Sequence, residues 1–262
     1  MENLLHCWEK IKERIRGRCV FLFLDFDGTL SSIVSTPDKA VIPGRVKALL
    51  RELSCKDDFK VAIISGRALA DIRKRIGVKG IIYSGNHGHE VESPRIDYKM
   101  QMPRGYLQAL SNLRQELKSK LKGVNGAYFE DKGISLAVHF REASKQETSI
   151  IKTIFRETTI IPSVAKKVKI RTGKKVIEVG PPGEWNKGKM VLWLLSRQKF
   201  CVGDREIVPF YLGDDLTDED AFMALKKEGI TVLVGDRRPS CASYYLKGPE
   251  EVYELLSLIH NI

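Results

Sequence analysis

Short apolar runs alternate with amphipathic segments along the first hundred residues of the chain. The runs CVFLFLDF (19–26), FKVAIISG (59–66) and GIIYSGNHG (80–88) are continuous, as is typical of strands that are buried on both faces. Between them, residues 43–53 and 67–77 repeat their apolar positions at the spacing of a helix. Strands that alternate with helices predict a parallel sheet with right-handed crossover connections.

The pattern changes in the middle of the chain. Two amphipathic segments predict helices, and two pairs of short runs, each interrupted by a turn that contains glycine, predict β-hairpins. In chain order these elements are a helix at 106–121, a hairpin at 127–141, a helix at 145–159 and a hairpin at 168–180. This order predicts an α+β unit with an antiparallel sheet.

Helices and buried strands alternate again from residue 187 to the end of the chain. The simplest architecture is therefore one α/β core that is split in the sequence. We predict that residues 1–100 and 183–262 form this core, and that residues 101–182 form an inserted α+β domain.

The composition is that of an ordinary globular protein, with 43% hydrophobic and 29% charged residues. No apolar run approaches the roughly 18 residues that a membrane span requires. The first 17 residues carry apolar side chains at helical spacing, which predicts a helix packed on the core rather than a signal peptide. The cysteines are scattered and form no C-x-x-C pair, which predicts free thiols and a cytoplasmic location. They are Cys7, Cys19, Cys55, Cys201 and Cys241.

Most of the positive charge lies in the predicted insertion. The chain has a formal net charge of +11, and residues 101–180 alone carry 16 lysines and arginines against 7 acidic residues. Nucleic acid, an anionic surface or a phosphorylated small substrate would each explain this asymmetry. A solvated charged face would explain it equally well.

Polar residues follow the predicted strands at the points where the strands end. Any one of them is explained by the capping of a following helix or turn. The carboxyl ends of parallel strands meet at one edge of a sheet, however, and ligands of open α/β sheets bind there. The carboxylates that gather at this edge are Asp25, Asp27, Asp214, Asp215 and Asp218.

Several carboxylates at one point repel one another unless a cation lies among them. Carboxylate oxygens beside an open position suit Mg²⁺, which is usually held by one or two carboxylates, by waters and by substrate phosphate. The sequence therefore predicts a magnesium-dependent phosphoryl-transfer site.

Roles for five residues follow from the chemistry that such a site needs. Asp25 comes directly after the first strand and is placed to attack phosphorus, and Asp27 is placed to move protons. Gly28 lets the backbone turn close to the phosphate. Ser65 is predicted to donate a hydrogen bond to a phosphoryl oxygen, and Lys187 to offset negative charge. Taken alone, Lys187 is explained equally well as a surface lysine.

These residues lie in recognisable motifs. The segments DFDGTL, SGR, the lysine of NKGK and GDDLTDED, in this order, resemble the motifs of the haloacid dehalogenase (HAD) superfamily of phosphatases. More narrowly, FLDFDGTLSSIV, IISGR, GNHGHE, EDKGISLAVHFR, GKKVIEVGP and WNKG resemble the trehalose-6-phosphate phosphatases.

The resemblance implies a HAD-like Rossmannoid core with a parallel sheet and an inserted α+β cap of the C2 type with an antiparallel sheet. It also implies Mg²⁺-dependent hydrolysis of trehalose 6-phosphate to trehalose and phosphate through an aspartyl-phosphate, which is the last step of trehalose biosynthesis. The expected partner is a small sugar phosphate, with no nucleic acid and no membrane, and the chain is expected to be a monomer.

The resemblance further implies individual roles in the core. Asp25 would be the nucleophile, and Asp27 the general acid and base, with its main-chain carbonyl on Mg²⁺. Asp214 would be a direct metal ligand, supported by Asp215 and Asp218. The implied metal site therefore consists of Asp25, Asp27, Asp214, Asp215 and Asp218, and the implied catalytic residues are Asp25, Asp27 and Lys187.

Other residues would bind the substrate. Glutamate and lysine side chains on neighbouring hairpin strands supply the paired donors and acceptors that sugar hydroxyls need. The implied substrate-binding residues are Ser65, Gly66, Arg67, His87, Glu130, Lys132, Arg141, Lys174 and Glu178.

Two positions depart from the pattern of that family. Asn186 stands where an aspartate usually precedes the lysine, and Gly180 stands where an arginine often follows the glutamate of the cap strand. Neither is expected to take part in chemistry, but Gly180 bears on the sugar specificity.

Two alternatives remain. The first is a HAD phosphatase of another substrate, such as sucrose phosphate, mannosylglycerate phosphate or phosphoglycolate, against which the EDKGxS…HFR and GKKVxE stretches argue. The second is a nucleic-acid-binding protein. Against it, the basic residues are interleaved with glutamates and few aromatic residues, and no nucleic-acid-binding motif is evident.

Overall fold

A computed structural model of the chain describes residues 1–199 and 205–262. The chain divides into two compact units. Unit 1 consists of residues 1–33, 40–99 and 185–262, and unit 2 consists of residues 34–39 and 100–184. Four cysteines are free thiols, and Cys201 lies outside the described residues.

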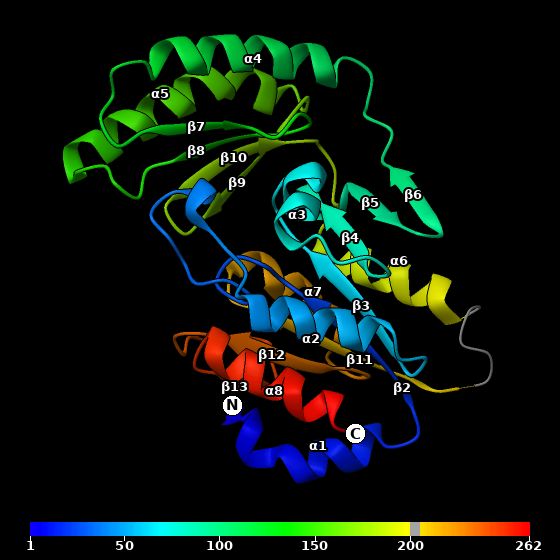
Figure 1. Ribbon diagram of the computed structural model, residues 1–262. Coiled ribbons are helices and arrows are strands. Elements are labelled where there is room, and N and C mark those ends of the chain that lie inside the picture. The colour runs from blue at the N-terminus through cyan, green and yellow to red at the C-terminus, as the bar shows by residue number, and fades with distance from the viewer. Residues whose placement is uncertain (200–204) are drawn as a thin grey trace. The chain divides into compact units, whose positions relative to one another are not determined.

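A nine-stranded sheet forms the centre of unit 1 (Figure 1). The first seven strands of the spatial order given next pair with their neighbours in parallel, and the last two, β5 and β6, add an antiparallel edge. In spatial order they are β1 (Glu2–Asn3), β13 (Tyr244–Leu246), β12 (Ile230–Val234), β11 (Ile207–Gly213), β2 (Cys19–Leu24), β3 (Phe59–Ile64), β4 (Ile82–Gly85), β5 (Glu90–Ser93) and β6 (Ile96–Lys99).

Strand β2 lies in the middle of this sheet because all six of its side chains are apolar and buried. It pairs with β11 on one side and with β3 on the other. The sheet is covered on both faces by helices, as the continuous apolar runs predict. These helices are α1 (Trp8–Ile15), α2 (Gly44–Ser54), α3 (Leu69–Ile76), α6 (Lys187–Lys199), α7 (Glu219–Leu225) and α8 (Pro249–His260).

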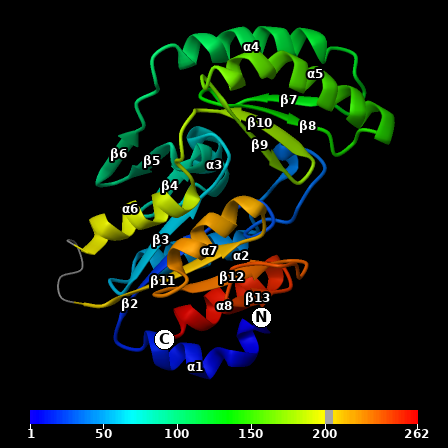
Figure 2. The same ribbon diagram turned by 180° about the vertical axis from the view of Figure 1, so that it is seen from behind.

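The helices divide between the two faces. Helices α2 and α8 lie in front of the sheet in Figure 1, whereas α6 and α7 lie in front of it in Figure 2, which is seen from behind. The face under α6 and α7 holds a large apolar cluster that includes Phe21, Phe23, Tyr211 and Phe222. Because strands β2, β3 and β11 are fixed by this packing, the residues at their carboxyl ends have little freedom to move.

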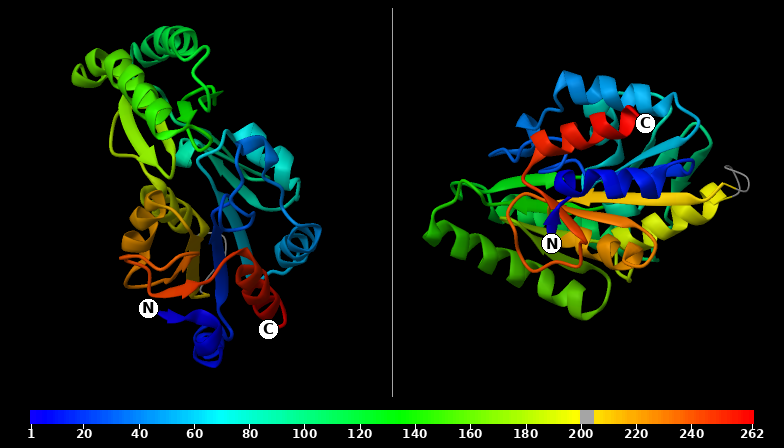
Figure 3. Two further views of the ribbon diagram at one scale, coloured as in Figure 1. Left: turned by 90° about the vertical axis from the view of Figure 1, so that its left-hand side faces the viewer. Right: turned by 90° about the horizontal axis from the view of Figure 1, so that it is seen from below.

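Unit 2 is a four-stranded antiparallel sheet with two helices on one face, visible in Figure 1 and in the left view of Figure 3. The helices bury Leu110, Leu117 and Phe155 against Leu136 and Val138 of the sheet, among others. The sheet order is β7 (Tyr128–Asp131), β8 (Leu136–His139), β10 (Val176–Gly180) and β9 (Lys169–Gly173), and the helices are α4 (Tyr106–Lys120) and α5 (Lys145–Val164).

The structure differs from the sequence prediction in several places. The N-terminal helix begins only at Trp8, after the short strand β1 and a 3₁₀ turn over Leu4–Cys7, and strand β13 was not predicted. The β5–β6 hairpin was not predicted, because its short strands alternate with many polar residues and lack an apolar run. Helix α5 extends beyond residue 159 to Val164 and contains Pro162. Residues 34–39 group with unit 2, where the Tyr128 hydroxyl donates to the Asp38 carboxylate at 2.8 Å.

Among the described helices, none combines the length and the apolar character needed to cross a membrane.

Candidate active site

Three charged side chains meet at the carboxyl end of β2. Lys187 is the first residue of α6, and its ammonium donates to Asp25 Oδ1 at 2.7 Å and to Asp218 Oδ1 at 2.8 Å. All three side chains are buried, with 7% or less of their surface exposed. A buried ion pair of this kind is held in place strongly, because the loss of either partner leaves a charge in a poorly solvated site.

The carboxylate of Asp218 has hydrogen-bond donors on both oxygens. Besides Lys187, the hydroxyl of Tyr211 donates to Oδ1 at 2.6 Å, and the backbone N–H of Asp215 donates to Oδ2 at 3.0 Å. Tyr211 lies on β11 and is fully buried against Phe222. Asp218 therefore orients Lys187, and Tyr211 orients Asp218.

Each charge at this point affects the pKa of its neighbours. Burial raises the pKa of Asp25 well above its ordinary range; Lys187 acts against this rise, and the carboxylates of Asp218 and Asp214 add to it. Burial opposes the charge on Lys187, but Asp218 and Asp25 hold the pKa of Lys187 well above its usual value. One lysine therefore does not fully offset the carboxylates around it.

The donor set fits a hard divalent cation. Among the described residues, one carboxylate oxygen from each of Asp25, Asp214 and Asp218 lies within 4.8 Å of the other two. Gly28, which has φ +86°, makes room for the Asp214 carboxylate, since a Cβ there would clash with Asp214 Oδ2. A cation at this point would relieve the repulsion that adds to the effect of burial on the pKa of Asp25.

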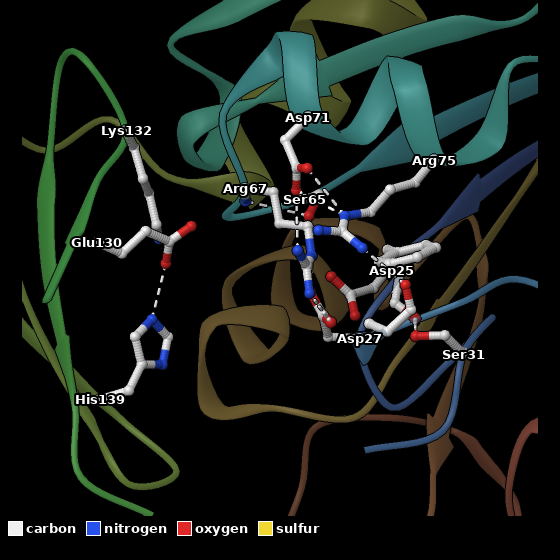
Figure 4. A network of polar contacts seen from close by, with 12 residues as sticks. Asp25, Asp27, Ser31, Ser65, Arg67, Asp71, Arg75, Glu130, Lys132 and His139 are labelled. Atoms are coloured by element: carbon white, nitrogen blue, oxygen red, sulfur yellow. Dashed lines mark hydrogen bonds and ion pairs between the residues drawn. The ribbon is translucent and has the colours of Figure 1, made fainter. Parts of the chain in front are cut away.

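Asp27 points to a different set of partners (Figure 4). Its two carboxylate oxygens accept from Nε and Nη2 of Arg67, both at 2.7 Å. The remaining nitrogen of the guanidinium, Nη1, donates to the Asp71 carboxylate at 2.8 Å, and this carboxylate also accepts from Arg75. Burial opposes the charge on Arg67, but Asp27 and Asp71 raise its pKa above the ordinary value.

The turn after β3 lies beside the turn after β4. Ser65 is buried, and its hydroxyl accepts from the backbone N–H of Arg67 at 3.2 Å. The backbone N–H of His87 donates to the carbonyl of Ser65 at 3.0 Å. A Cβ at Gly66 would lie 2.6 Å from the His87 ring, so glycine allows the two turns to approach each other.

In unit 2, a row of residues crosses the sheet on the face opposite the helices. Glu130 on β7, Ala137 on β8, Glu178 on β10 and Arg171 on β9 are paired directly in register. Directly paired residues point to the same face, and the alternate residues Leu136, Val138, Ile177 and Val179 pack toward the helices instead.

The polar groups on this face are paired with one another. Lys132 donates to Glu178 at 3.0 Å, with both side chains buried, and Glu130 lies 2.7 Å from Nε2 of His139. A Cβ at Gly180 would lie 2.5 Å from Nη1 of Arg171, so the glycine leaves the space that this guanidinium occupies.

The remaining substrate-binding candidates lie near the β9–β10 turn. Lys174 is an exposed residue of this turn, and its carbonyl accepts from Nη2 of Arg141 at 3.3 Å. These two residues therefore contact each other through the Lys174 backbone.

The structure brings some of the predicted core residues together and separates others. Asp25, Lys187, Asp214 and Asp218 converge as the strand ends suggest. The Asp215 carboxylate instead caps the following turn, accepting from the N–H of Leu216 at 2.7 Å.

Sequence reasoning missed several residues that lie beside the predicted ones, with Arg75 reaching them through Asp71. They are Asp71, Arg75, His139, Arg171 and Tyr211. A tyrosine within the apolar run IVPFYLG was the one signal for Tyr211, because a buried hydroxyl needs a partner. The others required the register of the strands or the path of a turn.

Known proteins give the context for this geometry. A family model described as Trehalose-phosphatase matches residues 23–250. The probable trehalose-phosphate phosphatase 4 of Oryza sativa subsp. japonica is 34% identical over 265 residues, which cover 97% of this chain and 69% of the rice protein.

Solved structures share the fold. The C-terminal domain of trehalose-6-phosphate phosphatase from C. albicans matches with a TM-score of 0.79 and 24% identity, over 97% of this chain and 96% of that one. A haloacid dehalogenase-like hydrolase from Bacteroides thetaiotaomicron matches with a TM-score of 0.63 and 13% identity, over 92% and 99% of the two chains. The predicted HAD-like fold with its α+β insertion is thus confirmed. Since the family model spans both units of the structure, the chain belongs to the trehalose-phosphatase family.

Proposed function

We propose that the chain is a Mg²⁺-dependent phosphatase that hydrolyses trehalose 6-phosphate to trehalose and inorganic phosphate. The observation that carries this proposal is the family match over residues 23–250, which includes the whole of the inserted unit as well as the carboxylate site. In trehalose biosynthesis this reaction is the last step. The cytoplasmic location and the monomeric state stay predictions.

The proposed reaction has two steps, each of which uses Asp25 and Asp27. In the first, an Asp25 carboxylate oxygen attacks phosphorus, the bond between phosphorus and the sugar oxygen breaks, and Asp27 gives its proton to the departing oxygen. In the second, Asp27 takes a proton from water, the water oxygen attacks phosphorus, and the aspartyl-phosphate bond breaks. Free phosphate leaves and the Asp25 carboxylate is restored.

Lys187 and Ser65 assist by holding the phosphoryl group. Lys187 keeps Asp25 in one orientation through a 2.7 Å bond, and its charge offsets part of the negative charge that accumulates during transfer. Mg²⁺, held by the carboxylates of Asp25 and Asp214 and by the main-chain carbonyl of Asp27, would supply further positive charge to the phosphoryl oxygens. Asp218 is assigned the role of orienting Lys187 beside this site, because its oxygens already accept from Lys187, Tyr211 and the Asp215 N–H.

Replacing Gly28 with alanine is expected to weaken Mg²⁺ binding by about tenfold or more, because the new Cβ would displace the Asp214 carboxylate. Isothermal titration calorimetry of the protein with Mg²⁺ measures this directly. The control is Gly17→Ala, since Gly17 also has a positive φ, +70°, but has nothing within 4 Å of its Cβ position. Equal Mg²⁺ affinities in both variants and the wild type would show that Asp214 is not a ligand.

The sugar is assigned to unit 2. Trehalose presents only hydroxyls and ether oxygens, which require donors and acceptors at fixed positions. The row that contains Glu130 and Glu178 supplies acceptors, and Lys132 supplies a donor. Arg141 and Lys174 add positive charge near the β9–β10 turn.

Glu178→Gln is expected to reduce kcat/KM for trehalose 6-phosphate by about tenfold or more, because the amide replaces one of the paired charges that would face the sugar. The same variant is expected to hydrolyse 4-nitrophenyl phosphate within about twofold of the wild-type rate, since that ester has no sugar to bind. Glu157→Gln, an exposed glutamate of α5, is the matched control. Equal losses on both esters would remove Glu178 from sugar recognition.

The substrate is tested by measuring kcat/KM for a panel of phosphate monoesters, with Mg²⁺ and with a chelator. The panel contains trehalose 6-phosphate, sucrose phosphate, mannosylglycerate phosphate and phosphoglycolate. The proposal predicts a clear preference for trehalose 6-phosphate that is lost on chelation. A preference for another member would assign that substrate instead, and activity that persists without Mg²⁺ would reject the metal requirement.

A further inference from the structure

We propose that Asp71 is a positioning residue for the proton-transfer step, and that it acts by fixing the guanidinium of Arg67 against Asp27. This inference rests on the proposed phosphatase function. Asp71 lies in the first turn of α3 and has no place in the motifs that suggested the active site.

Arg67 holds Asp27 through a fork of two parallel bonds. The guanidinium edge formed by Nε and Nη2 meets both carboxylate oxygens of Asp27 at 2.7 Å, as Figure 4 shows. A bidentate pair of this kind sets the plane of the carboxylate as well as its position. Arg67 therefore sets the orientation of Asp27, and when Asp27 carries the proton for the first step, its other oxygen is left to accept from the same guanidinium.

Asp71 determines where that guanidinium lies. It accepts from Nη1 of Arg67 at 2.8 Å, on the side away from Asp27. The Arg67 side chain is only 6% exposed, so water cannot take over this bond if Asp71 is removed. The Phe26 ring lies 5.3 Å from the centre of the same guanidinium and leaves its edges to the two carboxylates.

Asp71 is itself held from the other side. Nε of Arg75 donates to both oxygens of Asp71, at 2.9 and 2.8 Å, and Nη1 of Arg75 donates to the carbonyl of Ala40 at 2.8 Å. A chain of hydrogen bonds thus runs from Arg75 through Asp71 and Arg67 to Asp27 (Figure 4). At its far end, Arg75 is held by the carbonyl of Ala40. The backbone of unit 1 fixes its far end.

A purely structural role of Asp71 would affect the substrates differently from a positioning role. An acidic residue in the first turn of a helix, paired with an arginine four residues later, stabilises that helix by a few tenths of a kcal/mol. Such a role would affect every substrate equally. A positioning role affects a substrate according to how much its leaving group needs a proton, because a misplaced Asp27 delivers that proton poorly.

The test is Asp71→Asn, which removes the charge and keeps the shape. We measure kcat/KM, which reports the steps up to the first phosphoryl transfer, with 4-nitrophenyl phosphate, phenyl phosphate and trehalose 6-phosphate. The loss is expected to be within about twofold for 4-nitrophenyl phosphate, whose leaving group departs without a proton, and to reach about tenfold or more for the sugar ester. Phenyl phosphate is expected to lie between them.

Two controls separate the alternatives. Glu116→Gln removes the carboxylate of a surface pair, with Lys120 at 2.7 Å, four residues apart on α4, and is expected to change none of the three values. Glu178→Gln is expected to treat the two aryl esters alike, because neither carries a sugar. The ratio of the two aryl esters therefore tests Asp71 even if the natural substrate proves to be a different sugar phosphate.

An equal loss on all three esters, or no loss on any, would overturn the proposal. If Asp71→Asn does not fold, as judged by circular dichroism, Arg75→Gln is tested in its place, since it removes the support of Asp71 without touching Arg67. The same ratio of phenyl to 4-nitrophenyl phosphate then decides the question.

Discussion

Replacing Asp25 with asparagine is expected to reduce phosphate release from trehalose 6-phosphate by at least about 10⁴-fold, because an amide is a very poor nucleophile toward phosphorus. The fold is expected to be retained. Asparagine has nearly the same shape as aspartate, and its carbonyl oxygen can still accept from Lys187, which keeps Asp218 as its second partner. Steady-state phosphate release and thermal unfolding of the same preparations measure the two expectations.

The control for Asp25→Asn is Asp97→Asn, which makes the same chemical change at an exposed position on β6. Its activity and stability are expected to equal those of the wild type. Substantial phosphatase activity in folded Asp25→Asn would remove Asp25 from the role of nucleophile.

Replacing Lys187 with methionine is expected to lower the free energy of unfolding by about 3–5 kcal/mol and to abolish activity as well. The side chain is 3% exposed and is the cation between Asp25 and Asp218, so its removal leaves two buried carboxylates facing each other without compensation. Urea denaturation followed by circular dichroism, in buffer that contains a chelator, measures the loss.

Lys189→Met is the matched control, because Lys189 is exposed and lies two residues further along α6. Its free energy of unfolding is expected to change by less than about 0.5 kcal/mol, as is usual for surface substitutions. A similarly small change in Lys187→Met would contradict the view that this lysine holds the carboxylate cluster together.

The convergence of Asp25 and Asp214 was predictable from the sequence because it depends only on the order of elements. Buried parallel strands place their carboxyl ends at one edge, so a carboxylate after β2 and another after β11 are neighbours once the strands pair. The position of Lys187 at the start of α6 needed the motif resemblance, since a lysine by itself is as easily a surface residue.

The network around Asp27 was not predictable in this way. Arg67 follows β3 in the sequence, and the motif resemblance implied that it contacts the substrate. Whether its guanidinium turns toward Asp27 and Asp71 depends on the path of a single turn and on side-chain rotamers, which hydrophobic periodicity does not specify. The same holds for Arg171, whose place in the row with Glu178 depends on the strand register of one hairpin.

The central claim is that Asp25 takes the phosphoryl group from trehalose 6-phosphate. It is tested most directly by mixing the wild-type protein with trehalose 6-phosphate and Mg²⁺, quenching with acid during the first turnover, and locating any phosphoryl group by peptide mass spectrometry. We expect a phosphorylated peptide that contains residues 19–32, with the added group on Asp25 and none in Asp25→Asn. A phosphoryl group on another residue, or rapid phosphate release in the first turnover with no labelled Asp25 at any quench time, would contradict it.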